Sequence, residues 1–450
     1  MSDQNSSQYG SAVASYFFGP RLLNLQIDSS VSKFNVSTLL FGSFFGIAMM
    51  SFINVCQPYL FTEVLKIPLN EQAPLAGDLT FWSEVVVIAT IGLLGAMSDK
   101  IGRKPIWVAA FLVFAAGYFL YPLAKDADQL LLFRMFFAVG LAANTAMLPL
   151  VANDYPVENS RGKMLSVCFM LNGLGFIILM TPLRGLSGYF EGLTDGDPEQ
   201  TARLWIWSAA TICLFVSAGL AIGLKAGAPA QLEKRDPLLS TLKIGVRAAK
   251  KLRVALAYIA AVVARGDMAV LSAFFVLWLT QEGIAAGMDT GEATRNAIKF
   301  YIFIQVFALI WLPVLGYILD RIDRVAGLAL AMILAGGGYS TLFLLDNPLS
   351  SKMWFCAVLI GMGEISANLA SLTLIGSEAP VKGRGAVLGL FSLCGAIGIL
   401  LIAKGGGTLS IDYGPIAPFG LVAVMNLVVL ILALIVLRIS RNDPAKVGSF

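Results

Sequence analysis

The chain contains twelve apolar runs, each of about 20 residues, which is the length an α-helix needs to cross the hydrocarbon core of a bilayer. Apolar and polar residues do not alternate within the runs as they would in the strands of a membrane barrel. Only 13% of the 450 residues are charged, whereas soluble domains carry roughly 25%. We therefore predict an all-α membrane protein with twelve transmembrane helices.

A polar stretch divides the runs into two groups of six. The expected organisation is an N-terminal segment (1–35), a six-helix half (36–224), a linker with a basic amphipathic helix (225–253), a second six-helix half (254–438) and a tail (439–450). The predicted spans are Val36–Val64, Leu79–Met97, Pro105–Leu123, Gln129–Val151, Met164–Pro182, Leu204–Leu224, Val254–Leu279, Phe300–Leu319, Val325–Leu345, Met353–Ile375, Ala386–Ala403 and Pro415–Leu437.

Lysine and arginine in the loops predict the orientation. With both termini on the same side, that side holds 22 of the 32 basic residues and the opposite side holds 8. Basic loops face the cytoplasm in membrane proteins, so we expect cytoplasmic termini in a multi-pass protein of the cell (inner) membrane. The polar N-terminus has no apolar signal region, and we expect that nothing is cleaved there.

Several functional classes are disfavoured. The chain has no histidine, which removes that residue from any metal site or catalytic triad, and its five cysteines sit in apolar runs without a C-x-x-C pair. It contains no H-E-x-x-H, G-x-S-x-G or phosphate-binding loop. We expect no catalytic residue, no metal and no cofactor. The basic residues are spread along the chain, which argues against nucleic acid as a partner.

The sequence repeats itself. The stretch from Gly316 to Arg324, which includes Asp320, matches the stretch from Gly95 to Arg103 at an offset of 221 residues. A second match, at an offset of 224, relates Asp154 to Glu378. Two halves in the same orientation are one of the architectures of secondary transporters. We therefore predict two parallel six-helix pseudo-repeats.

The loop between the second and third runs carries the repeat most clearly. It reads G-x-x-x-D-K-x-G-R-K, with Gly95, Asp99, Gly102 and Arg103 among its fixed positions. With the twelve spans and the repeat, this motif resembles the signature of the major facilitator superfamily, and the resemblance covers essentially the whole chain.

The resemblance implies a cytoplasmic gate between the halves. Asp99 is expected near the start of the eleventh helix, and Arg103 is expected to pair with Asp154 at the end of the fourth. Asp320 and Arg324 are their counterparts in the second half. The same resemblance implies that the first, fourth, seventh and tenth helices line a central cavity.

Two features depart from the family pattern. The fourth-helix motif R-x-x-x-G has Arg134 in place, but Ala138 stands at the glycine position and Gly140 follows two residues later. The glycine–proline pair of exporters is absent from the fifth helix, which weakens assignment as a drug/proton antiporter.

Charged and polar side chains within the spans are the candidate functional residues, and a charge near the bilayer centre costs at least ~2.5 kcal/mol. Three carboxylates are candidates for proton coupling: Asp267, Glu364 and Glu84. The candidates for the substrate cavity are Asn54, Gln57, Asn144, Arg265, Asn368 and Arg134. Each could instead form an interhelical hydrogen bond or ion pair, and Arg265 could either pair with a carboxylate or bind an anionic substrate.

These observations predict a secondary active transporter of a small organic solute that works by alternating access with proton coupling. The alternatives are a passive uniporter and a non-transporting membrane sensor on the same fold. The expected partners are a small-molecule substrate, protons and the bilayer, and the expected state is a monomer. Import and export both stay open.

Overall fold

The computed structural model describes residues 15–19, 25–227, 238–380 and 383–442. In this part of the chain, twelve helical segments are long and apolar enough to span a membrane, which confirms the predicted fold class. The first half is built from α1 (Lys33–Val55), α2 (Gln57–Tyr59), η1 (Leu60–Val64), α3 (Leu69–Ile101), α4 (Arg103–Leu120), η2 (Tyr121–Leu123), α5 (Ala127–Asp154), η3 (Glu158–Ser160), α6 (Arg161–Leu193) and α7 (Pro198–Gly223). The linker forms α8 (Leu238–Ala248), and the second half is built from α9 (Leu252–Val270), η4 (Leu271–Phe275), α10 (Val276–Ala285), α11 (Thr290–Leu319), α12 (Arg324–Ser340), η5 (Thr341–Leu344), α13 (Lys352–Glu378), α14 (Arg384–Tyr413) and α15 (Ala417–Asn442).

The two halves repeat the same helix pairings. In the first half α1 packs on α6, α3 on α5 and α4 on α7. The equivalent pairs of the second half, α9 with α14, α11 with α13 and α12 with α15, pack in the same way. The internal repeat in the sequence therefore corresponds to a repeat in three dimensions.

Several helices extend well beyond their apolar runs. The fifth span continues to Leu193 rather than ending at Pro182, and the eighth begins at Thr290 rather than Phe300. Asp289 caps the eighth by accepting hydrogen bonds from the first backbone N–H groups. Apolarity marks only the part of a helix inside the hydrocarbon, whereas capping sets where the helix begins.

The first helix of each half is interrupted by a π-turn. The first span breaks at Gln57–Pro58 and continues as η1, because proline has no N–H to donate to the helix. The seventh span contains η4 between α9 and α10. Such turns are frequent at functional sites, and here they flank the junction between the halves.

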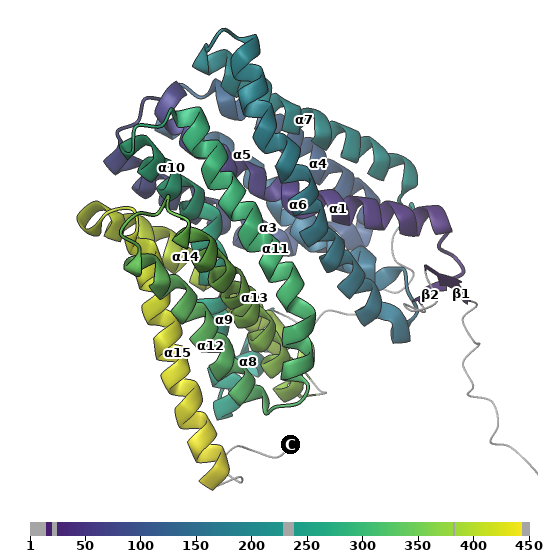
Figure 1. Cartoon of the computed structure of the whole chain (residues 1–450). Helices are drawn as coiled ribbons and strands as arrows, with labels where there is room; N and C mark the ends of the chain where they lie inside the picture. The colour runs from purple at the N-terminus through teal and green to yellow at the C-terminus, as the bar shows by residue number, and fades with distance from the viewer. Residues whose placement is uncertain (1–14, 20–24, 228–237, 381–382, 443–450) are drawn as a thin grey trace, which may run out of the picture.

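Two short elements lie at the end of the bundle where α4 and α9 begin. Helix α8 packs on the start of α14, and the Tyr258 hydroxyl donates to the Gly245 carbonyl over 3.1 Å. Helix α8 lies within the stretch 225–253, where the sequence predicts a linker helix, and residues 228–237 of that stretch lie outside the described residues. Figure 1 shows the β1–β2 hairpin at the same end of the first half.

The hairpin was not predicted from the sequence. Strands β1 (Ser15–Phe18) and β2 (Leu25–Asp28) pair antiparallel, and Ile27 bridges to Pro156 in the loop after α5. The side chain and backbone N–H of Ser30 donate to Asp28, which lowers the pKa of that carboxyl. Residues 15–18 and 25–28 thus fasten the N-terminal segment to the loop that follows Asp154.

Candidate functional site

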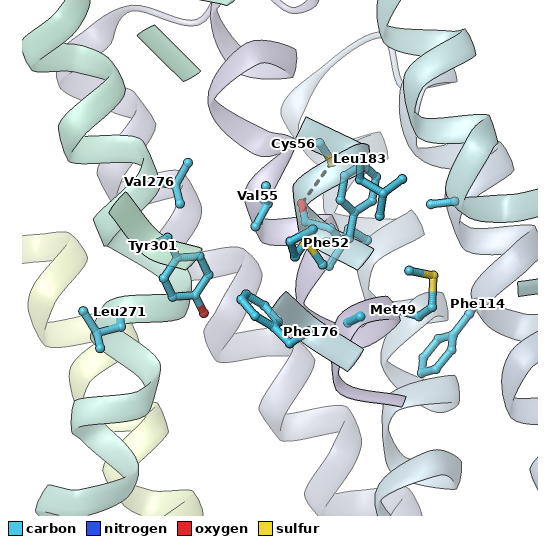
Figure 2. Packing of buried hydrophobic residues seen from close by; sticks show 14 of the residues in the cluster. Met49, Phe52, Val55, Cys56, Phe114, Phe176, Leu183, Leu271, Val276 and Tyr301 are labelled. Atoms are coloured by element: carbon cyan, nitrogen blue, oxygen red, sulfur yellow. Dashed lines mark hydrogen bonds between the residues drawn. The ribbon is translucent and has the colours of Figure 1, made fainter. Parts of the chain in front are cut away.

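The two halves contact each other through side chains at the end of the bundle that holds α10 and the start of α3, here called the α10 end. One continuous apolar cluster crosses between them there. Figure 2 shows Phe176 of α6 facing Tyr301 of α11, with ring centroids 5.3 Å apart, and Leu271 and Val276 nearby. The deeper apolar residues of the second half form a separate cluster around α9, α12 and α13.

Polar contacts reinforce this junction. Lys404 of α14 pairs with Asp78 of α3 at 2.5 Å, and Arg295 of α11 pairs with Glu191 of α6 at 2.9 Å. The Thr290 hydroxyl of α11 donates to the carboxylate of Glu63 in η1 over 2.5 Å. These contacts join helices that belong to different halves, and each lies at the α10 end.

Close backbone approach completes the junction. A Cβ on Gly77 of α3 would collide with the Ala403 carbonyl of α14. Nearer the opposite end, called the α8 end, a Cβ on Gly92 of α3 or Gly389 of α14 would meet no atom within 4 Å. Figure 1 likewise shows the halves side by side at the α10 end and diverging toward the end with β1, β2 and α8.

Three ionisable residues occupy the middle of the bundle. Glu84 lies 15 residues into the 33-residue α3, Arg265 lies 13 residues into the 34-residue seventh span, and Glu364 lies 12 residues into the 27-residue α13. Glu364 is 8% exposed and accepts a hydrogen bond from Gln305 over 3.2 Å. Glu84 belongs to the first half, whereas Arg265 and Glu364 belong to the second.

Two asparagines at repeat-related positions, Asn144 of α5 and Asn368 of α13, make the same contact. The Asn144 amide nitrogen lies 3.0 Å from the sulfur of Met50, and the Asn368 amide nitrogen lies 3.7 Å from the sulfur of Met268. Each methionine belongs to the first helix of its half. The sequence analysis did not include these methionines in the site. The only feature that could have indicated them is their position on helices predicted to line the cavity.

The remaining polar candidates of the first half form a buried cluster nearer the α10 end. Arg134 donates to the Ser83 hydroxyl over 2.9 Å and to the Asn54 side-chain oxygen over 2.7 Å. Gln57 donates to the Tyr121 hydroxyl over 2.9 Å. The two Arg134 bonds hold α1, α3 and α5 together, as interhelical hydrogen bonds do, whereas the Gln57 bond joins α2 to η2.

Asp267 has a different setting from the cavity position expected for it. Its carboxylate is fully buried and accepts a 2.9 Å hydrogen bond from Asn426 of α15, while Tyr339 of α12 donates to its backbone carbonyl. Arg265, two residues earlier, is partly exposed. Side chains two residues apart point to different helix faces, and the face of Asp267 meets the outer helices of its own half.

The loop motif forms an ion-pair cluster at the α8 end. Arg103 pairs with Asp99 at 2.5 Å and with Asp154 at 3.0 Å, so the expected Arg103–Asp154 pair is present. Gly102 has a φ of +98°, which glycine adopts without strain. Gly95 is buried one helical turn before Asp99. The predicted contact of Asp99 with the start of α14 stays a prediction, and residues 381–382 lie outside the described residues.

The second half builds its equivalent cluster from a different arginine. Arg253 at the start of α9 pairs with Asp323 at 3.0 Å and with Glu378 at 3.2 Å. Arg324, the repeat counterpart of Arg103, instead pairs with Asp320 and donates to the Leu319 carbonyl. The repeat predicted the acidic partner Glu378 but not the arginine that binds it.

Comparison with known proteins agrees with this architecture. A family model for the Major Facilitator Superfamily matches residues 39–403. The chain belongs to the Major Facilitator Superfamily. It is thus a multi-pass membrane protein of a family of solute transporters.

The magnetosome protein MamH of Paramagnetospirillum magneticum is 26% identical over 408 residues, which cover 88% of this chain and 90% of that protein. The magnetosome protein MamZ of the same organism is 24% identical over 86% of this chain. This chain spans only 60% of the length of MamZ. Among solved structures, the nucleoside transporter NupG has a TM-score of 0.70 at 13% identity, over 90% of this chain and 98% of NupG. A bacterial homologue of the human lysosomal transporter Spinster, in an inward-facing and occupied conformation, has a TM-score of 0.68 at 15% identity, over 92% of this chain and 98% of that one.

Proposed function

We propose that this superfamily member is a secondary active transporter that moves a small organic solute by alternating access and couples the movement to protons. The observation that carries the proposal is the set of midplane ionisable side chains, Glu84, Arg265 and Glu364, contributed by both halves. Charges are retained at the bilayer centre mainly where they serve substrate or ion pathways.

Alternating access is supported by the uneven contact between the halves. Apolar packing and the Lys404–Asp78 and Arg295–Glu191 pairs join them at the α10 end. With cytoplasmic termini, as the loop charges favour, the α10 end faces outward and this conformation is open inward. The similar Spinster homologue was captured facing inward. Transport would then require the α10 contacts to break while the Arg103 and Arg253 clusters bring the α8 ends together.

Proton coupling is supported best at Glu364. Its carboxylate is buried and accepts from the neutral amide of Gln305 rather than from a cation. A carboxylate desolvated in this way can bind and release a proton as its surroundings change. Glu84, half-buried on the opposite half, is the second candidate. Asp267 is the third, although its contact with Asn426 also fits a packing role.

The proposal is tested in proteoliposomes that hold the full chain. Internal and external pH are recorded while metabolites and amphipathic compounds are added one at a time. We expect at least one solute to trigger a proton flux that disappears when Glu84, Asp267 and Glu364 are replaced together by their amides. Solute uptake that persists uphill with unchanged pH dependence in this triple variant contradicts proton coupling. Solute movement without proton flux in the wild type favours a passive uniporter.

A further inference from the structure

Arg265 is a cation near the bilayer centre without an ion-pair partner among the residues that the structure describes. Its polar contact among these residues joins Nη1 to the sulfur of Met268 over 3.8 Å. Neither Glu364 nor Asp267 pairs with it, because these carboxylates accept from Gln305 and Asn426 instead. An arginine at this depth costs roughly 2.5–3.5 kcal/mol on insertion scales, so a partner that arrives from outside the chain would offset a real penalty.

The surrounding residues hold the Arg265 side chain in place. Its Cγ lies over Gly395 of α14, where a Cβ would come within 2.6 Å. Met268 contacts both Arg265 and the Asn368 amide, so the guanidinium and an amide donor flank one sulfur. The aliphatic part of Arg265 is thus packed, while the residue as a whole is partly exposed.

The opposing half presents a carboxylate to the same cation. Glu84 lies on α3 of the opposite half, and no ion pair joins it to Arg265 among the described residues. Gly77, two helical turns earlier on α3, lies against Ala403 of α14, and Gly395 is eight residues before Ala403. Since α3 and α14 run antiparallel, Glu84 comes level with the part of α14 that Arg265 covers.

We propose that Arg265 binds the anionic group of the substrate, and that Glu84 competes with that group for the guanidinium. The substrate class is then a small organic anion with a carboxylate or phosphate group, which the planar donors of arginine match in a bidentate way. Asn368 supplies a neighbouring amide donor. This inference deepens the proposed function and rests on it, since it names the chemistry of the transported solute.

The experiment measures thermal unfolding of the purified full chain through tryptophan fluorescence. Its probes are three matched pairs of an anion and an uncharged analogue: lactate and lactamide, succinate and succinamide, glycerol 3-phosphate and glycerol. We expect at least one anion to raise the Tm of the wild type while its analogue does not. Arg265→Gln should weaken that anion's binding about 10- to 100-fold, as expected for a lost charge-assisted contact.

Three further variants separate recognition from folding. Arg265→Lys keeps the charge but not the planar fork, and should bind the anion with an intermediate Kd. Glu84→Gln removes the competitor and should lower the Kd. Arg203→Gln, on the exposed face of α7 where Arg203 pairs with Glu199, is the matched control and should leave the Kd unchanged.

Equal stabilisation by an anion and its analogue overturns the inference, as does an unchanged Kd in Arg265→Gln or a raised Kd in Glu84→Gln. The same probes, together with neutral and cationic solutes, are followed as uptake into proteoliposomes. If no anion stabilises the wild type and only neutral or cationic solutes are taken up, the inference is wrong while the proposed transport stands. If no solute of any charge is taken up, the proposed function itself fails.

Discussion

Each half places a repeat-related asparagine against a methionine of its first helix, but the surroundings of the two asparagines differ. Asn144 is 2% exposed, and its side-chain oxygen accepts a 2.8 Å hydrogen bond from Trp107. Asn368 is partly exposed, and the nearby Arg265 shares its methionine sulfur. The first half uses this position for packing, whereas the second half leaves a donor accessible beside a cation.

The same contrast holds one helical turn away. Glu364 is four residues before Asn368, and its repeat counterpart is Gly140, four residues before Asn144. Gly140 packs against α4, where a Cβ would lie 2.8 Å from the Phe114 ring. One fold thus uses a single position for helix packing in one half and for an ionisable group in the other. At these two positions the first half packs helices together, whereas the second half carries candidate functional groups.

The largest expected effect separates two carboxylates of the second half. Glu364→Gln keeps the shape but removes the proton-binding group, so pH-gradient-driven uptake should fall about tenfold or more, a barrier change of at least ~1.4 kcal/mol. Asp267→Asn should lower uptake much less, because its carboxylate faces Asn426 on α15. Uptake by both variants is measured in proteoliposomes with and without a pH gradient.

The exposed Glu292→Gln on α11 is the control for loss of a carboxylate and should match the wild type. If Asp267→Asn loses coupling as completely as Glu364→Gln, the division between a coupling carboxylate and a packing carboxylate is wrong.

The next effect tests the packing role of Gly140 in the first half. Gly140→Ala forces a methyl group toward Phe114 and the Ala110 carbonyl, 2.8 and 3.0 Å away. Overpacking of this kind destabilises a fold by typically 1–3 kcal/mol. Denaturant unfolding of the purified chain should show this loss.

Gly185→Ala on α6 is the control, since a Cβ there meets nothing within 4 Å. It should be neutral or slightly stabilising, because alanine is favoured over glycine in helices by roughly 0.5–1 kcal/mol. Equal stability of the two variants would show that the Gly140 contact relaxes without strain.

The spans and the repeat could be predicted from the sequence because each has a local signature, whereas the Arg103–Asp154 pair was expected from the family resemblance. Apolar length marks a span, and matching residues at a fixed offset mark the repeat. The face that a buried side chain points to has no such signature. Asp267 and Arg265 are only two residues apart in the sequence, but the packing of α15 is what shows that Asp267 meets Asn426.

Two other features depended on contacts distant in sequence. Arg253 pairs with Glu378 although it is not the repeat counterpart of Arg103, whereas Arg324, which is that counterpart, pairs with Asp320. The junction between the halves joins Lys404 to Asp78, which are 326 residues apart. The β1–β2 hairpin had a weak signal in its short strands, which the twelve apolar runs obscured.

A third prediction compares the two asparagines directly. Asn144→Ala removes the acceptor of the buried Trp107 N–H and should cost about 1–2 kcal/mol of unfolding free energy, near the upper end for hydrogen bonds in membrane proteins. Asn368→Ala, which loses only a weak contact to sulfur, should cost less than ~0.6 kcal/mol. Unfolding curves of both variants in one detergent give the two values.

Uptake should show the reverse order. Asn368→Ala should lower uptake more than Asn144→Ala does, and by more than its own loss of stability explains. Trp107→Phe removes the donor of the same hydrogen bond. The stability loss in the double variant should not exceed the sum of the losses in the two single variants. Equal stability losses at Asn144 and Asn368 would remove the proposed difference between the halves.

The smallest expected effect concerns the arginines at the α8 end. Arg253→Gln breaks two ion pairs whose arginine side chain is 19% exposed, and should destabilise the second half by about 1 kcal/mol. Arg324→Gln breaks one pair with Asp320, which is 77% exposed, and should change stability by less than ~0.5 kcal/mol. The stability loss caused by Arg253→Gln should be smaller at high salt, because salt already weakens these ion pairs in the wild type. If Arg324→Gln lowers stability more than Arg253→Gln does, the repeat identifies the functional arginine better than the contacts do. Arg253 is then not the equivalent of Arg103 in the second half.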